Sequence, residues 1–203
     1  MTRYGYDKTT MDEIAREAGV SKGALYLVWP GKEELFDALL EHEMKRLLLD
    51  LRGRVEADPQ GGSLAALYGH TLLALQNNPL ISALYTRDGR VLGDFVHRQD
   101  PQRYTRRLLL SKNSVAQMQA AGLLRADIRP EVMTYLFSLI ALGFMSISAI
   151  IPAAEAPPLT ETAVAMSAMI QSGLALPGGE SPVTRETTLK MLDLMLSQYM
   201  ERE

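Results

Sequence analysis

The chain has 203 residues, 47% of them hydrophobic, which is enough apolar material for the core of one large domain or two small ones. Leu, Ala and Met are frequent whereas alternating Val, Ile and Thr are rare, so the composition favours an all-helical fold over a sheet. The absence of cysteine excludes disulfides, thiolate metal sites and cysteine nucleophiles, and the formal net charge of −3 neither supports nor excludes nucleic acid as a partner.

Two short helices and one long helix are predicted at the N-terminal end. The run Thr10-Met-Asp-Glu13 is a capping box, and it begins a helix that Gly19 ends. Ser21 caps a second short helix that reaches about Val28. After the break at Pro30-Gly31, a longer helix is predicted from Lys32 to about Arg54.

A polar, glycine-containing linker, 56–62 (EADPQGG), follows the long helix. We place a domain boundary beside it, which divides the chain into residues 1–54 and 55–203. No convincing strand is found in the second part. Helices are expected over 63–78, 80–86, 90–98, 101–121, 130–152, 160–176 and 184–200.

The segment 132–151 (VMTYLFSLIALGFMSISAII) carries no charge over twenty residues and is long enough to cross a membrane. A central helix that is buried on all sides has the same composition. We expect the buried helix, because polar Thr and Ser residues dilute the segment and the rest of the chain is amphipathic. The first thirty residues also have no apolar signal segment, so a cytoplasmic protein without a membrane partner is expected.

Residues 10–29 (TMDEIAREAGVSKGALYLVW) are predicted to form a helix-turn-helix, in which a second helix is offered to the major groove of DNA. Ile14, Val20 and Leu25 are spaced to pack the two helices together. The outward side chains are then expected to be Lys22, Gly23, Ala24, Leu27 and Val28. Phosphates accept hydrogen bonds from Lys, Thr and Tyr side chains and from helix N-termini, so Thr10, Lys22, Tyr26 and Lys32 are candidate phosphate contacts.

The run Thr9-Thr10-x-x-Ile14-Ala15-x-x-Ala18-Gly19-Val20-Ser21-Lys22-Gly23-x-Leu25-Tyr26-x-x-Trp29-x-x-Lys32-Glu33-x-Leu35 closely resembles the tetracycline-repressor (TetR) family. A weaker resemblance to the same family is found in the stretch Gly122-Leu-Leu-Arg-Ala-Asp-Ile-Arg-Pro130. The resemblance implies a homodimer whose N-terminal helices bind operator DNA and whose C-terminal domain binds a small ligand that releases the DNA. It also implies that Thr10, Tyr26 and Lys32 hold phosphates and that Lys22 to Ala24 face base edges. The expected DNA-binding residues are Thr10, Ser21, Lys22, Gly23, Ala24, Tyr26 and Lys32.

Three features depart from the family pattern. Ala24 stands where the family usually has threonine, and Leu27 and Val28 stand where it has aromatic or histidine residues, so the second helix is poor in hydrogen-bond donors. Base readout would then be weak or would depend on thymine methyl groups and DNA shape. Trp29 replaces the usual phenylalanine, which is a mild change.

The third departure is the family's first helix, since Met1 to Tyr4 are too few residues to form one. Without that helix, the apolar faces of Ile14, Leu25 and Phe36 are expected to lose their cover, at about 1.5–3 kcal/mol for each large side chain. Either the natural start lies upstream, which we favour, or the DNA-binding domain is impaired.

The apolar helix at 132–151 and the broad stripe of the last helix predict a two-fold dimer interface through 132–151 and 184–200. That stripe comprises Leu189, Met191, Leu192, Leu194, Met195, Leu196 and Tyr199. The alternative is that both helices belong to the core of a monomer.

A ligand pocket that suits a mostly apolar molecule is expected among polar-tipped and apolar side chains of the C-terminal helices. The candidates are Tyr68, Gln76, Tyr85, Phe95, Tyr104, Met118, Met133 and Phe137, any of which is as easily ordinary core. His70 is expected to be a satisfied, partly buried histidine.

An enzyme is not expected. His42, His70 and His97 lack metal-site spacing, and no phosphate loop or nucleophile elbow is present, so no cofactor or metal is predicted. The sequence therefore predicts a DNA-binding transcription regulator, more often a repressor, that a small apolar ligand releases from its operator. The alternative is a ligand-binding or interaction dimer that no longer binds DNA.

Overall fold

The computed structural model describes residues 5–98, 112–147, 150–152, 154–176 and 182–200. Over these residues the chain is helical, as expected, and an isolated antiparallel bridge joins Leu124 to Ala175. The helices are α1 (Met11–Ala18), α2 (Lys22–Val28), α3 (Lys32–Ala57), α4 (Leu64–Gln76), α5 (Pro79–Thr86), α6 (Gly89–Leu92), α7 (Phe95–Arg98), α9 (Lys112–Ala120), α10 (Pro130–Ser146), α11 (Leu159–Leu174) and α12 (Pro182–Met200).

The caps of the first two helices form as predicted. Thr10 Oγ1 accepts a hydrogen bond from the Glu13 amide at 3.3 Å, while the Glu13 carboxylate accepts one from the Thr10 amide at 2.9 Å. Gly19 ends α1 in the left-handed conformation, with φ at 68°, which glycine adopts without strain. The Ser21 hydroxyl oxygen accepts a hydrogen bond from the Ala24 amide at 3.1 Å and so begins α2.

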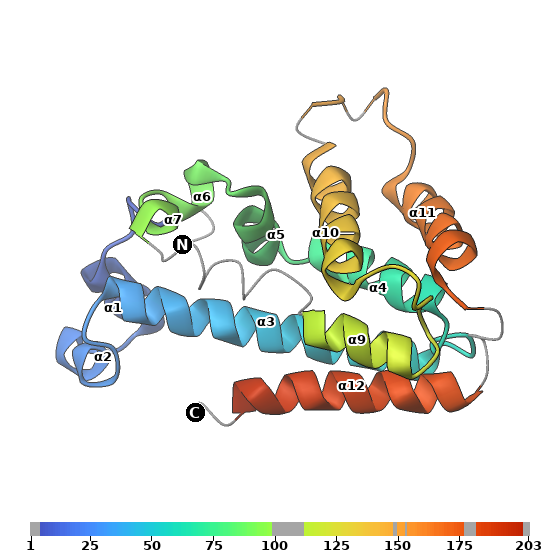
Figure 1. The fold of residues 1–203 in the computed structure, drawn as a ribbon. Helices are drawn as coiled ribbons and strands as arrows, with labels where there is room; N and C mark the ends of the chain where they lie inside the picture. The colour runs from blue at the N-terminus through green and yellow to red at the C-terminus, as the bar shows by residue number, and fades with distance from the viewer. Residues whose placement is uncertain (1–4, 99–111, 148–149, 153, 177–181, 201–203) are drawn as a thin grey trace.

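Helix α3 is the spine of the molecule. Figure 1 shows α1 and α2 at one end of α3, and α4, α9, α10 and α11 gathered around its other end. The main hydrophobic core contains Met44, Leu47, Leu48, Leu51 and Val55 of α3, together with side chains of α4, α9, α10, α11 and α12. Helix α3 runs without interruption from Lys32 to Ala57 and so passes the predicted domain boundary near residue 54. The helix does not mark a division there, and the boundary stays a prediction.

A second, smaller core holds the first turns of α3 against α5, α6 and α7. Three aromatic rings form its centre: Phe36 and Phe95 have centroids 4.6 Å apart, and Tyr6 lies 5.0 Å from Phe36 and 5.5 Å from Phe95. Phe36 is completely buried, and Leu25 is buried between α1 and α2. The prediction that these side chains lose their cover is therefore wrong: Tyr6 and Phe95 cover Phe36, and Ile14 is partly buried against the cluster that contains Leu25.

Several helix bounds differ from the prediction. Residues 90–98 form two short helices because Gly93 turns the chain with φ at 49°. Pro79 opens α5 at its first turn. The predicted helix at 101–121 falls partly outside the described residues, which show α9 over Lys112–Ala120.

The uncharged segment predicted a helix that is buried on all sides. Helix α10 is instead buried on one face only. One face, with Met133, Phe137 and Phe144, packs into the main core. The opposite face leaves four large apolar side chains exposed: Val132, Tyr135, Leu139 and Leu142. Within the described part of the chain, no helix is both long and apolar enough to cross a membrane.

Helix α12 lies along α3, and this packing uses the stripe that the sequence assigned partly to a second subunit (Figure 1). Leu192 and Leu196 are buried in the main core, and Leu189, Met191 and Met195 pack against it. Arg52 of α3 holds Asp193 at 2.6 Å. The side chain of Tyr199 lies outside the described residues.

Candidate DNA-binding site

The two helices of the helix-turn-helix are held together by a small apolar cluster. Met11, Ala15 and Leu25 are buried in it, and Ile14 and Trp29 are partly buried against it. Val20, which was predicted to pack between the helices, is instead 45% exposed, because the turn directs it outward.

The outward face of α2 carries the side chains that were expected there. Lys22, Gly23 and Ala24 are exposed on its first turn. Leu27 is 88% exposed and Val28 is 63% exposed. A hydroxyl oxygen that accepts a hydrogen bond still has its own proton to donate, so Ser21 keeps a donor beside the N-terminus of α2.

Lys22 is held by an acidic residue of the first helix. Its Nζ lies 2.6 Å from the Asp12 carboxylate and 5.9 Å from the centroid of the Tyr26 ring. The hydrogen bond and the negative charge of Asp12 raise the pKa of Lys22. The sequence pattern had not singled out Asp12, which partly neutralises the one lysine on α2.

The Thr10 hydroxyl forms its hydrogen bonds within the capping box. Oγ1 donates to the Glu13 carboxylate at 2.9 Å while it accepts from the Glu13 amide. The hydrogen bonds from Thr10 hold the pKa of Glu13 below its usual range, so this carboxylate is negative at neutral pH. A phosphate contact by Thr10 requires its hydroxyl to turn away from Glu13.

Lys32 is half-buried at the start of α3. Its Nζ donates to the Tyr6 carbonyl oxygen at 2.9 Å and lies 4.2 Å from the centroid of the Tyr6 ring. An ammonium over an aromatic face is attracted by the ring quadrupole. Lys32 therefore fastens the N-terminal segment to α3, a role that sequence reasoning missed, and its phosphate contact stays a prediction.

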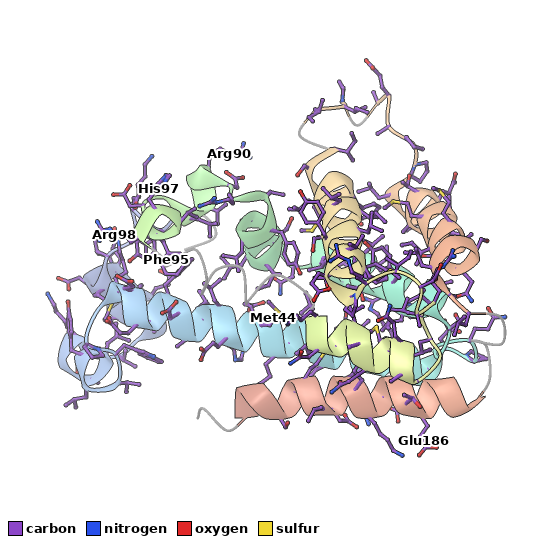
Figure 2. The ribbon with its side chains drawn as sticks, viewed as in Figure 1. Met44, Arg90, Phe95, His97, Arg98 and Glu186 are labelled. Atoms are coloured by element: carbon purple, nitrogen blue, oxygen red, sulfur yellow. The ribbon has the colours of Figure 1, made fainter. Side chains whose placement is uncertain are left out.

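The segment 5–9 also joins the helix-turn-helix to the rest of the chain. The Tyr6 amide donates to the Val91 carbonyl oxygen at 2.8 Å, and the Asp7 carboxylate accepts from the Asp94 amide at 3.0 and 3.2 Å. We call this contact between residues 5–9 and 90–95 the junction. Figure 2 shows Phe95, His97 and Arg98 of α7 beside α1 and the first turns of α3. Gly5 and Gly93 both have a positive φ in the structure. These two glycines are the signal in the sequence that could have indicated the junction.

The expected pocket residues do not all lie together. Tyr68, Met118, Met133 and Phe137 are buried in the main core, where the Tyr68 hydroxyl donates to the Phe137 carbonyl oxygen at 3.0 Å and burial raises the pKa of Tyr68. Tyr85 is partly buried between the two cores, Phe95 belongs to the smaller core, and Gln76 is exposed. Tyr104 lies outside the described residues.

His70 is a partly buried residue with a satisfied ring, as expected. Its Nε2 lies 2.9 Å from the Asp58 carboxylate, which joins α4 to the end of α3. Because Asp58 satisfies the ring, no bound ligand is needed to explain why His70 is partly buried.

Residues 1–39 match the profile of the bacterial regulatory proteins of the tetR family. Over these residues the chain is similar to that family. The matched residues include α1, α2 and the beginning of α3, the helices whose geometry is described above. The family consists of transcription regulators, which agrees with the expectation that the chain is not an enzyme.

Curated relatives resemble the same end of the chain. An uncharacterised HTH-type transcriptional regulator of Bacillus subtilis, YhgD, is 44% identical over 46 residues, which are 23% of this chain and 24% of the relative. The nucleoid occlusion factor SlmA of Haemophilus influenzae is 36% identical over 56 residues, which are 28% of this chain and 26% of that protein. The matches therefore span about a quarter of the length of these relatives.

The whole fold also has a counterpart among solved structures. A protein of Shewanella sp. PV-4, described as a tetR family transcription regulator, superimposes with a TM-score of 0.55 over 86% of this chain and 92% of its own. Its sequence identity is 21%, so this likeness concerns the fold: the described part of this chain shares the helical architecture of that protein beyond its first two helices.

Proposed function

We propose that this protein is a DNA-binding transcription regulator of the TetR family that inserts α2 into the major groove of operator DNA. The observation that carries the proposal is the outward face of α2, which is exposed at one end of helix α3. Gly23 and Ala24 would face base edges beside Lys22, whose ammonium would contact a phosphate, as would Thr10, Ser21, Tyr26 and Lys32.

A two-fold homodimer would place two such helices on successive half-sites. The exposed apolar face of α10 (Val132, Tyr135, Leu139 and Leu142) supports a dimer, and α11 beside it exposes Val164 and Met169. Each of these helices carries a single charged residue, Glu131 on α10 and Glu161 on α11. Since α12 packs along α3, we propose that α10 and α11, rather than α10 and α12, meet the second copy.

The regulator would be released from DNA by a small, mostly apolar molecule that enters the main core near Tyr68 and Phe137. The position of α5 supports this proposal, because Ile81 packs in the main core while Leu80 and Leu84 pack in the smaller one beside the junction. A ligand that displaces α5 would then move α6 and α7 against the helix-turn-helix. Repression, rather than activation, is the sign of regulation that we propose.

The experiment is a titration of the full chain with duplex DNA, with fluorescence anisotropy measured at several salt concentrations. Random duplexes that the protein enriches over repeated rounds of selection provide the operator probe. We expect tight binding to the selected DNA and weaker binding to random DNA, both falling as salt rises. Lys22→Ala should lower the slope of log affinity against log salt by about one for each subunit if Lys22 contacts a phosphate.

Lys190→Ala is the matched control, because Lys190 of α12 also pairs with a carboxylate, that of Glu186, on an exposed surface. It should leave the salt slope unchanged. If the full chain enriches no sequence and binds no duplex in a salt-dependent way, the proposed function is wrong, and the alternative of an interaction or ligand-binding dimer is favoured.

A further inference from the structure

The face of α2 that is free to enter a groove is apolar at its centre. Leu27 is 88% exposed and contributes nothing to the cluster that joins α1 to α2. Gly23 and Ala24 precede it by four and three residues, so the three lie on one face of the helix. Because Gly23 and Ala24 have small side chains, Leu27 projects furthest from this face towards a surface that approaches it.

The polar side chains of α2 are poorly placed to read hydrogen-bonding groups of bases. Guanine is read by Arg or Lys and adenine by Asn or Gln, and α2 (KGALYLV) has Lys22 alone of these four types. The Lys22 ammonium already lies 2.6 Å from the Asp12 carboxylate. The apolar group that DNA presents in the major groove is the 5-methyl group of thymine.

Resting on the proposed function, we infer that Leu27 is a specificity-determining residue that packs against the 5-methyl groups of thymine. The operator then carries thymine at the base pairs beneath α2 in each half-site. Val28, exposed next to Leu27, borders the same contact.

The test replaces thymine by uracil, one position at a time, in the operator selected by the full chain. This change removes one methyl group and leaves every hydrogen-bonding group in place. At the contacted positions it should weaken binding about fourfold, the factor expected for burial of one methyl group. In Leu27→Ala the same uracil substitutions should have no effect, because the side chain that contacts the methyl group is gone.

Leu49→Ala is the matched control, since Leu49 of α3 is also an exposed leucine in a helix. This variant should keep the full uracil effect, and thermal unfolding should show that both variants fold. If an operator is selected but uracil has no effect at any position, or has the same effect in Leu27→Ala, the inference is overturned while the proposed function stands. If no operator is selected and no salt-dependent binding occurs, both fail together.

Discussion

Gly23 is a glycine that the fold itself does not require. A Cβ at this position would meet only the Ser21 hydroxyl oxygen, at 3.9 Å, and the backbone is in the ordinary helical region. Glycine inside a helix costs about 0.5–1 kcal/mol relative to alanine. The structure has room for the better helix former, so the proposed approach of a DNA groove to α2 would account for the missing side chain.

Gly23→Ala should therefore stabilise the protein, by up to about 1 kcal/mol, and weaken its binding to the selected operator. Thermal unfolding measures the first effect and a DNA titration measures the second. Gly53→Ala is the control, since Gly53 is an exposed glycine within α3 whose Cβ would meet nothing within 4 Å. That variant should gain stability without any change in DNA binding. Equal DNA affinity of Gly23→Ala and the unaltered protein would contradict the explanation.

At the scale of elements, the sequence predicted the helix-turn-helix because all of its signals are local. The capping box at Thr10, the cap at Ser21 and the left-handed Gly19 act within a few residues, and the structure shows each of them. The junction could not be predicted in this way. It joins Asp7 to Asp94 through a backbone amide, and a contact between residues 87 positions apart leaves no periodic pattern.

The junction is tight enough to be tested by a double-mutant cycle. A Cβ at Gly93 would run into the Asp7 carboxylate, and φ of 49° is in the left-handed region. Gly93→Ala should cost about 1–2 kcal/mol from the backbone strain and more from the displaced carboxylate. Asp7→Ala alone should cost about 1 kcal/mol, since it removes the acceptor for the Asp94 amide.

In the Asp7→Ala background, Gly93→Ala should cost less than it does alone, because the carboxylate that it displaces is absent. The free energies of unfolding in urea give all four corners of the cycle. Gly89→Ala is the control in the same segment, as its Cβ meets nothing within 4 Å, and it should show no coupling to Asp7. Strictly additive changes for Asp7 and Gly93 would contradict the displacement of the Asp7 carboxylate by a Cβ at position 93.

At the scale of the whole molecule, an apolar stripe predicts burial but does not say what buries it. The sequence predicted a dimer interface through both the apolar helix α10 and the last helix, α12. The structure separates them: Leu192 and Leu196 of α12 are buried within the chain, whereas Leu139 and Tyr135 of α10 remain exposed. Which of the two stripes is buried within the chain depends on which helix packs against α3. The packing of the entire chain decides this.

The proposed dimer predicts different outcomes for two matched substitutions. Leu139 of α10 is 48% exposed and Leu194 of α12 is 52% exposed, so glutamate at either position meets water in the single chain. A carboxylate buried between two copies is strongly unfavourable, and a two-fold interface contains the substitution twice. Leu139→Glu should therefore give a folded monomer in sedimentation velocity, while Leu194→Glu should stay a dimer. The monomer should also bind the selected operator more weakly, because it engages one half-site at a time. If Leu194→Glu dissociates the protein and Leu139→Glu does not, the interface lies on α12, and the assignment to α10 and α11 is wrong.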